Sequence, residues 1–159
     1  LSKEILDATE KYCGGVAVSF HPHIKNIFHE AVTQLSQIKT RLNVHVILGT
    51  TQSLIDLQSI YERYHNVVEY FVILPYQVAG RAKELQVNDT FNTFFMWLET
   101  LPYEQQKQFA FGALFYEYLN TIKLNLKIDI YEPEIYSGYR LMDDSFKLLR
   151  KSSYNLQPK

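Results

Sequence analysis

The chain has 159 residues, of which 47% are hydrophobic, 21% charged and 14% aromatic, and its formal net charge is -1 at pH 7. This size and composition are typical of one globular domain with a packed core. The near-zero charge offers no electrostatic basis for capturing nucleic acid or an anionic membrane, so we expect neither as a partner. No stretch of the sequence reaches the roughly 18 apolar residues that a membrane-spanning helix needs.

A single cysteine, Cys13, limits the thiol chemistry of the chain. It excludes an internal disulfide and any metal site built from several cysteines of this chain. One cysteine is typical of a reducing compartment, and residues 1–20 do not read as a signal peptide, so we expect a cytoplasmic protein. Because no catalytic base is recognisable beside it, Cys13 is predicted to be a small buried residue rather than a nucleophile.

Apolar runs alternate with amphipathic segments along the first half of the chain. The patterns predict helices over 2–12, 24–39 and 54–64, and strands over 16–20, 44–48 and 70–74. The strand starts lie about 26 to 28 residues apart, close to the length of a βαβ unit. We therefore expect an α/β fold of parallel strands joined by right-handed helical crossovers. The first run is short and continuously apolar, which predicts a strand buried on both faces.

In the second half of the chain, the regular alternation of strand-like and helix-like segments ends. It predicts a helix from Asn88 or Asp89 to Glu99, a helix over 104–123, a strand over 126–131 and a last helix over 143–151. Aromatic residues at helical spacing predict core packing, with a surplus available to cover an open sheet edge. No linker interrupts the chain, so we expect a single domain over 1–159, with βα units in 1–85 and a helical and irregular C-terminal extension in 86–159.

Two histidines, His21 and His23, follow the first predicted strand. Imidazoles two residues apart at a strand end form the first half of the metal site in amidohydrolase-type barrels. Such a site needs further ligands on later strands. His45 lies within a predicted strand and the other histidines lie on predicted helices. The sequence therefore favours two polar loop histidines, and we assign no metal ligand.

Three segments together resemble the second half of the radical SAM domain. They are Gly-Val-Ala-Val-Ser-Phe over 15–20, Asn-Val-His-Val-Ile-Leu-Gly over 43–49, and Val-Ile-Leu-Pro-Tyr-Gln-Val-Ala-Gly-Arg-Ala over 72–82. In order and spacing they are similar to the fourth, fifth and sixth strands of that barrel, and the proline followed by Gly-Arg-Ala is the most specific match. The resemblance covers about residues 1–85 and implies a partial TIM-like half-barrel.

The resemblance also implies a cofactor site at the strand ends. Ser19 would hydrogen-bond S-adenosylmethionine, the backbone of Leu74, Pro75, Tyr76 and Gln77 would face its adenine, and Arg81 would order the sixth-strand loop. His21 and His23 would lie at the barrel mouth, facing the substrate. No catalytic residue is assigned to this chain.

The departures from the family pattern define what is missing. Radical SAM enzymes hold a 4Fe-4S cluster with three closely spaced cysteines and carry a Gly-Gly-Glu motif; this chain has neither. We therefore expect that the chain, which begins at Leu1 rather than Met, starts after the third strand of a longer parent enzyme. A natural relative without a cluster is the alternative. In both cases the chain alone is predicted to be inactive, because the redox chemistry belongs to the cluster.

The partner implied by this interpretation is the missing N-terminal half of the barrel. The exposed sheet edge of a half-barrel also predicts self-association. Two other classes of function stay open at this point: a metal-dependent hydrolase half-barrel that uses His21 and His23, and a non-catalytic α/β interaction domain whose aromatic helices bind another chain.

Overall fold

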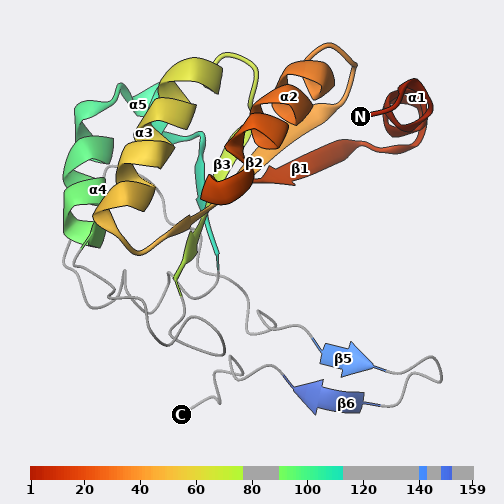
Figure 1. Cartoon of the computed structure of the whole chain (residues 1–159). Helices are drawn as coiled ribbons and strands as arrows, with labels where there is room; N and C mark the ends of the chain where they lie inside the picture. The colour runs from red at the N-terminus through yellow and green to blue at the C-terminus, as the bar shows by residue number, and fades with distance from the viewer. Residues whose placement is uncertain (77–89, 113–139, 143–147, 152–159) are drawn as a thin grey trace.

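The computed structural model describes residues 1–76 and 90–112, together with the backbone of 140–142 and 148–151 (Figure 1). In chain order the elements are α1 (Lys3–Tyr12), β1 (Gly15–Ser19), η1 (Pro22–Ile24), α2 (Lys25–Leu35), β2 (Arg41–Leu48), α3 (Thr51–Tyr64), β3 (Tyr70–Pro75), α4 (Thr90–Thr100), α5 (Tyr103–Gln106), β4 (Phe109–Phe111), β5 (Arg140–Met142) and β6 (Leu148–Lys151).

Four strands form one parallel sheet in the order β1-β2-β3-β4. Each strand pairs in parallel with the next one along the chain, so the prediction of parallel neighbours is confirmed. Across the middle of the sheet, Ser19 pairs with His45, His45 with Val72, and Val72 with Ala110. β5 and β6 pair with each other as a separate antiparallel ladder.

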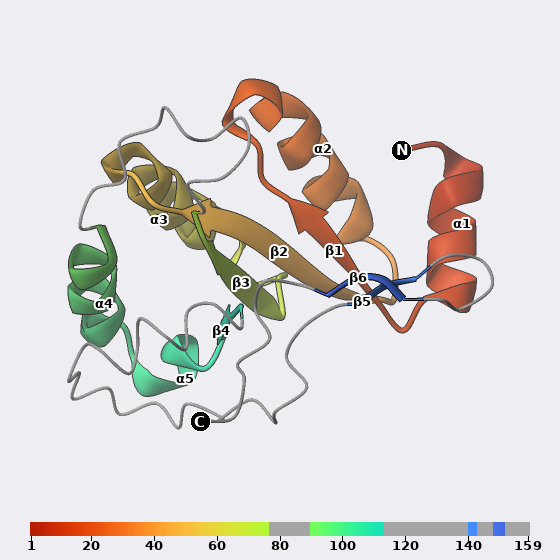
Figure 2. The same cartoon turned by 90° about the horizontal axis from the view of Figure 1, so that it is seen from below.

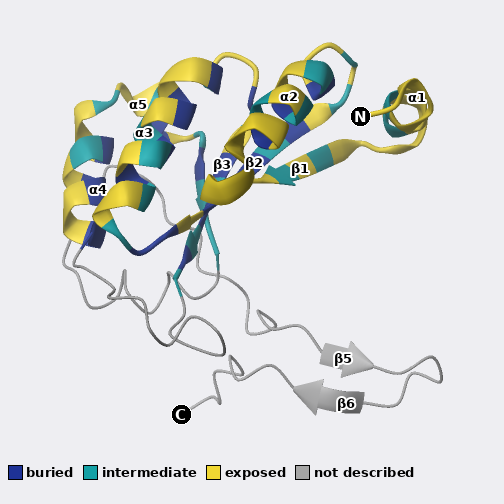
Figure 3. Ribbon diagram, viewed as in Figure 1, coloured by how far each residue is buried: buried dark blue, intermediate teal, exposed yellow. Residues whose placement is uncertain are grey.

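Helices α2, α3 and α4 all lie on the same face of the sheet (Figures 1 and 2). Their buried hydrophobic side chains are Phe28, Val32, Leu35, Leu54, Leu57, Ile60, Tyr61, Tyr64, Phe91, Phe94, Phe95 and Leu98. The strands contribute Leu42, Val44, Val46, Leu48, Phe71, Ile73 and Phe109 to the same hydrophobic core. The sheet and one helical layer therefore enclose a single core, and Figure 3 shows the buried residues concentrated between them.

Local signals explain where helix α3 begins. Thr50 precedes it with extended backbone, and its hydroxyl accepts a hydrogen bond from the Ser53 backbone N–H at 3.1 Å. In return the Ser53 hydroxyl accepts from the Thr50 N–H at 3.0 Å. This capping box satisfies two backbone donors that a helix start would otherwise leave unpaired. The periodicity that aligned Leu54, Leu57 and Ile60 is confirmed, because all three are buried.

The face of the sheet opposite the helices is much less covered by the described residues. We call it the open face and define it by the outward positions of the four strands: Ala17, Ser19, Asn43, His45, Ile47, Tyr70, Val72, Leu74 and Ala110. None of these residues is fully buried, whereas their core-facing neighbours in β2 and β3 are.

The prediction that the first strand is buried on both faces was wrong. In β1, Val16 and Val18 are partly buried against the core, while Ala17 and Ser19 are exposed. β1 is the first strand in the sheet order, and in the part of the chain that the structure describes helices cover one side of it. A short β-branched run reports apolar character but does not reveal whether a second layer exists to cover it.

Helix α2 ends at Leu35 rather than at the predicted Lys39. The Ser36 N–H still donates to the Val32 carbonyl four residues back, but the Gln37 and Ile38 N–H groups donate to carbonyls only three residues back, those of Gln34 and Leu35. The Lys39 N–H donates instead to the Glu10 carboxylate at 2.8 Å. Ile38 still packs against the core, as the helical spacing of apolar residues predicts. The same spacing also predicts Ile27 on the apolar side, but its side chain is 63% exposed.

The predicted helix over 104–123 was wrong within the described residues. Helix α5 covers only Tyr103–Gln106, and β4 follows at Phe109–Phe111. β4 pairs with β3, and the residue before β4 takes part as well, since the Phe71 N–H donates a hydrogen bond to the Gln108 carbonyl at 2.7 Å. A strand of three residues is too short to show the alternation of apolar and polar residues from which a strand is predicted.

Towards the C-terminus, residues 148–151 are strand β6, so the predicted helix over 143–151 was also wrong there. Earlier in the chain, the helix predicted from Asn88 or Asp89 to Glu99 is confirmed as α4, with Phe91, Phe94, Phe95 and Leu98 buried. The predicted strand over 126–131 and the tail beyond 151 lie outside the described residues.

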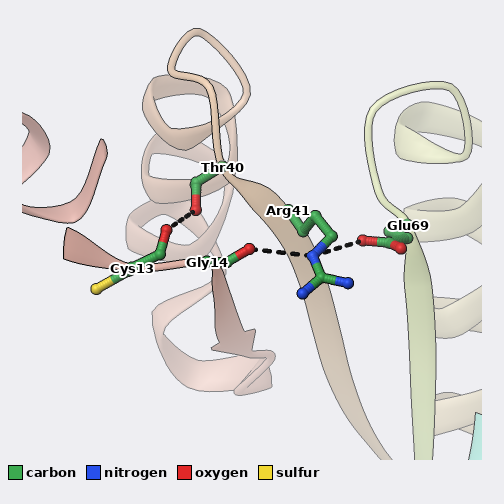
Figure 4. A network of polar contacts seen from close by, with 5 residues as sticks. All are labelled: Cys13, Gly14, Thr40, Arg41 and Glu69. Carbon is green, nitrogen blue, oxygen red and sulfur yellow. Dashed lines mark hydrogen bonds and ion pairs between the residues drawn. The ribbon is translucent and has the colours of Figure 1, made fainter. Parts of the chain in front are cut away.

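A polar network ties together the amino ends of the first three strands (Figure 4). The Arg41 Nε donates to the Gly14 carbonyl at 3.0 Å and lies 3.8 Å from the Glu69 carboxylate. Beside it, the Thr40 hydroxyl donates to the Cys13 carbonyl at 2.9 Å. Arg41 therefore links the segments that precede β1 and β3, at the edge of a parallel sheet that ordinarily serves stability rather than chemistry.

Candidate functional site

The carboxyl ends of the four strands lie along one edge of the sheet, where α/β folds usually bind ligands. In β1, β3 and β4, the first residue after the strand still makes a backbone hydrogen bond to the neighbouring strand. Phe20 donates to His45 at 2.8 Å, Tyr76 to Leu48 at 2.8 Å, and Gly112 to Ile73 at 2.9 Å. The loops that follow therefore leave the sheet from fixed positions.

Tyr76 lies directly against Gly49 at this edge. A Cβ built on Gly49 would be 2.3 Å from the Tyr76 Cβ, far inside van der Waals contact. The position after β2 thus requires glycine because the neighbouring backbone approaches so closely. The Ser53 hydroxyl also accepts from the Gly49 N–H at 3.1 Å, which fixes this turn against helix α3.

Ser19 occupies the last position of β1 on the open face. Its registered neighbour on the same face is His45, so the two side chains stand on adjacent strands, about 4.8 Å apart in backbone spacing. Asn43 lies two residues before His45 on the same face. Three hydrogen-bonding side chains therefore share one area of an otherwise largely apolar face.

The Oδ1 atom of Asn43 is buried and has no hydrogen-bond partner among the residues that the structure describes. A buried acceptor left without a partner costs on the order of 1–3 kcal/mol, so such atoms are rare and call for an explanation. Ala17 and Tyr70 flank Asn43 in the register, and neither donates a hydrogen bond to it in the described structure.

The electrostatic character of the open face follows from its residue types. Arg41, at the amino end of β2, is the charged residue at that margin, and it already pairs with Glu69. Between Arg41 and the carboxyl ends, the open-face positions of the described strands carry no Lys, Arg, Asp or Glu. This face is therefore suited to uncharged or weakly charged groups rather than to a phosphate.

His21 and His23 are exposed in the segment that leaves β1, with ring centroids 5.8 Å apart. His21 caps the short helix η1 through its backbone, since the Ile24 N–H donates to its carbonyl at 3.0 Å. Within the part of the chain that the structure describes, no three His, Cys, Asp or Glu side chains gather closely enough to hold a metal ion. The hydrolase hypothesis gains no third ligand from these residues.

The predicted cofactor residues fall into three groups. Ser19 and Leu74 lie on the open face, whereas Pro75 is buried on the helical side and Tyr76 is half-buried just beyond it. Gln77 and Arg81 lie outside the described residues. Sequence reasoning missed Asn43 and His45, although their alternation with the apolar Leu42, Val44 and Val46 was a readable sign that they share one face.

Cys13 is exposed, so its prediction as a buried residue was wrong. It caps helix α1 at the amino end of β1, which is opposite to the end where Ser19 lies. With one cysteine in the chain, the residues present do not fit a 4Fe-4S cluster, which needs several thiolates.

Among the described residues, no helix is long and apolar enough to cross a membrane. A scan against protein-family models, a search of curated proteins and a search of solved structures found no match to this chain.

Proposed function

We propose that this chain is the C-terminal half of a radical SAM barrel enzyme, with the open face forming part of the barrel interior. The observation that carries the proposal is the strand order: four parallel strands follow one another in chain order, with three helices on one face. Doubly wound sheets reverse their strand order and place helices on both faces. An unreversed order with a single helical layer is the arrangement from which βα barrels are built.

In this proposal β1, β2 and β3 take the places of the fourth, fifth and sixth barrel strands, as the sequence resemblance implies. β4 extends the same parallel series and would take the seventh place. The helices would form the outer layer, and the half-exposed positions of β2 and β3 would face inward.

S-adenosylmethionine is the cofactor that this half would help to hold. Ser19, on the open face at the end of β1, would donate or accept a hydrogen bond to it. Tyr76, fixed against Gly49, would bring its backbone to the same edge. When bound, S-adenosylmethionine supplies the carbon–sulfur bond that such enzymes break reductively; the residues of this chain would orient it and limit its access to water.

The cluster and its cysteines would belong to the other half of the barrel, which is the partner that the proposal requires. The free edge of β1 is where a third strand would pair in parallel; without it, two copies of the chain would associate through that edge. The proposal implies that the parent enzyme works in a reducing compartment, the cytoplasm.

The experiment is anaerobic iron–sulfur reconstitution of the parent protein, followed by a dithionite-dependent assay of S-adenosylmethionine cleavage. The proposal predicts cluster uptake and formation of 5′-deoxyadenosine, with Ser19→Ala reducing cofactor affinity about three- to tenfold through a lost hydrogen bond. A parent that contains no cysteine triplet and takes up no cluster would exclude the radical SAM assignment.

A further inference from the structure

The segment that leaves β1 carries two histidines on a well-fixed stretch of backbone. Phe20, which precedes the segment, is buried, and its N–H donates to the His45 carbonyl at 2.8 Å. Pro22 then begins the short helix η1, and the Ile24 N–H donates to the His21 carbonyl at 3.0 Å. The fixed φ angle of the proline and this closed turn hold the histidines on either side of Pro22 at a set separation along the backbone.

The imidazole rings of His21 and His23 lie close together and face solvent. Both residues are exposed, and their ring centroids are 5.8 Å apart with the ring planes inclined at 50°. Among the residues that the structure describes, neither ring makes a hydrogen bond or an ion pair with another side chain. Their ring nitrogens are therefore accessible to a ligand that arrives from solution.

The separation of the rings is close to that of two imidazoles bound to one metal ion. A zinc–nitrogen bond of about 2.0–2.1 Å puts each ring centroid roughly 3.2 Å from the ion, so two rings at the tetrahedral angle have centroids about 5.2 Å apart. The observed separation is 5.8 Å, and small rotations of two exposed side chains would close the difference. Imidazole nitrogens suit zinc, whereas magnesium and calcium prefer oxygen ligands.

We propose that His21 and His23 together bind a zinc ion at the carboxyl end of β1. The two imidazoles supply two of its four ligands, and water fills the other positions. The His, Cys, Asp and Glu side chains of the described segments offer no third ligand, so the site is open rather than closed like a structural zinc site. This site is independent of the proposed function, because neither S-adenosylmethionine nor the other half of the barrel contributes to it.

The test uses the full chain and three matched variants, His21→Gln, His23→Gln and His45→Gln. Each variant removes one imidazole, and His45→Gln is the control because His45 lies within β2, outside the proposed pair. Zinc affinity is measured by competition with a chromophoric chelator, and circular dichroism checks that each variant keeps its fold. We expect His21→Gln and His23→Gln each to weaken zinc binding at least about tenfold, and the control to change it less than about twofold.

Nuclear magnetic resonance of the histidine ring nitrogens identifies the ligands directly. On addition of zinc, the signals of His21 and His23 should shift together, while those of the other histidines stay in place. Zinc affinity that both His21→Gln and His23→Gln retain, or a wild-type chain that binds no zinc, would overturn the proposal. A loss in His45→Gln as large as in the other two variants would overturn it as well, because the ion would then be held by a different set of side chains.

Discussion

At the scale of single residues, the glycine most tightly approached by a neighbour is Gly49, among Gly14, Gly15, Gly49 and Gly112, and that neighbour is Tyr76. The atom that an added Cβ would meet at 2.3 Å is the Tyr76 Cβ, which cannot swing away as the end of a flexible side chain can. Gly14 offers the contrast, because the nearest atom to its added Cβ is 4.0 Å away at the tip of Arg41. Gly14, which precedes β1, therefore has room for a larger side chain, whereas Gly49, which follows β2, does not.

We predict that Gly49→Ala lowers the free energy of unfolding by about 1–3 kcal/mol, since the added methyl forces the β2 and β3 ends apart. Gly14→Ala should change it by less than about 0.5 kcal/mol. Urea denaturation of both variants, followed by circular dichroism, makes the comparison. Equal effects at the two positions would mean that Tyr76 does not approach Gly49 as described.

His29 on α2 supplies a pH-dependent contribution to stability. Burial lowers its pKa below 6.5, the nearby positive charges of Arg63 and Lys25 lower it further, and its Nδ1 lies 2.8 Å from the Tyr64 hydroxyl. Because the folded-state pKa is depressed, the unfolded chain takes up a proton as the pH falls through 6.5 while the folded chain still resists it. The contribution of His29 is therefore complete above pH 6.5 and decreases as the pH falls towards the folded-state value.

We accordingly expect the urea concentration at the unfolding midpoint to decrease as the pH is lowered from about 7.5 to about 5.5. The decrease should be smaller in His29→Gln. Glutamine keeps a hydrogen-bonding group near Tyr64 but does not titrate. The other histidines stay in place in both proteins, so the difference between wild type and variant isolates His29. An unchanged pH dependence in His29→Gln would contradict the burial of this imidazole.

At the scale of elements, the sequence predicted best where a long periodic segment packs against one surface. The apolar positions of α3 and α4 repeat over several turns, and the ones at helical spacing are buried: Leu54, Leu57, Ile60 and Tyr61 in α3, and Phe91, Phe94, Phe95 and Leu98 in α4. The sequence did not predict β4, which has only three residues and is stabilised by packing against the rest of the sheet. Phe71 and Phe109 stack with ring centroids 5.6 Å apart, a contact between residues far apart in sequence that no local pattern reveals.

We predict that Phe109→Ala costs about 3–5 kcal/mol of folding stability, because it removes a buried ring that touches β3, α3 and α4. Met96→Ala on α4 is the control; its side chain is 69% exposed and the change should stay within about 0.5 kcal/mol. Thermal or urea unfolding of the two variants checks this. A mild effect at Phe109 would contradict the assignment of β4 to the sheet.

The candidate site was predictable in part for the same physical reason. Ser19 is the second-last residue of the strand predicted over 16–20, so its place near a strand end could be read from the sequence. The pairing of Ser19 with His45 could not, because register depends on how two strands 26 positions apart align. The exposure of Cys13 was equally hidden, since it depends on β1 being an edge strand.

At the scale of the whole molecule, one helical layer covers one face of a parallel sheet, and the described residues leave the other face and the β1 edge without a second layer. Backbone groups at an open edge and half-exposed apolar side chains favour association with another surface. The proposed half-barrel accounts for both features together, because the missing half would pair with β1 and enclose the open face.

The measurement that tests this most directly is an experimental structure of the parent protein with S-adenosylmethionine bound. We predict that an upstream strand pairs in parallel with β1, and that the ligand lies over the open face within hydrogen-bonding distance of Ser19. A sheet that ends at β1, or a helix packed across the open face, would contradict the half-barrel and the cofactor site together.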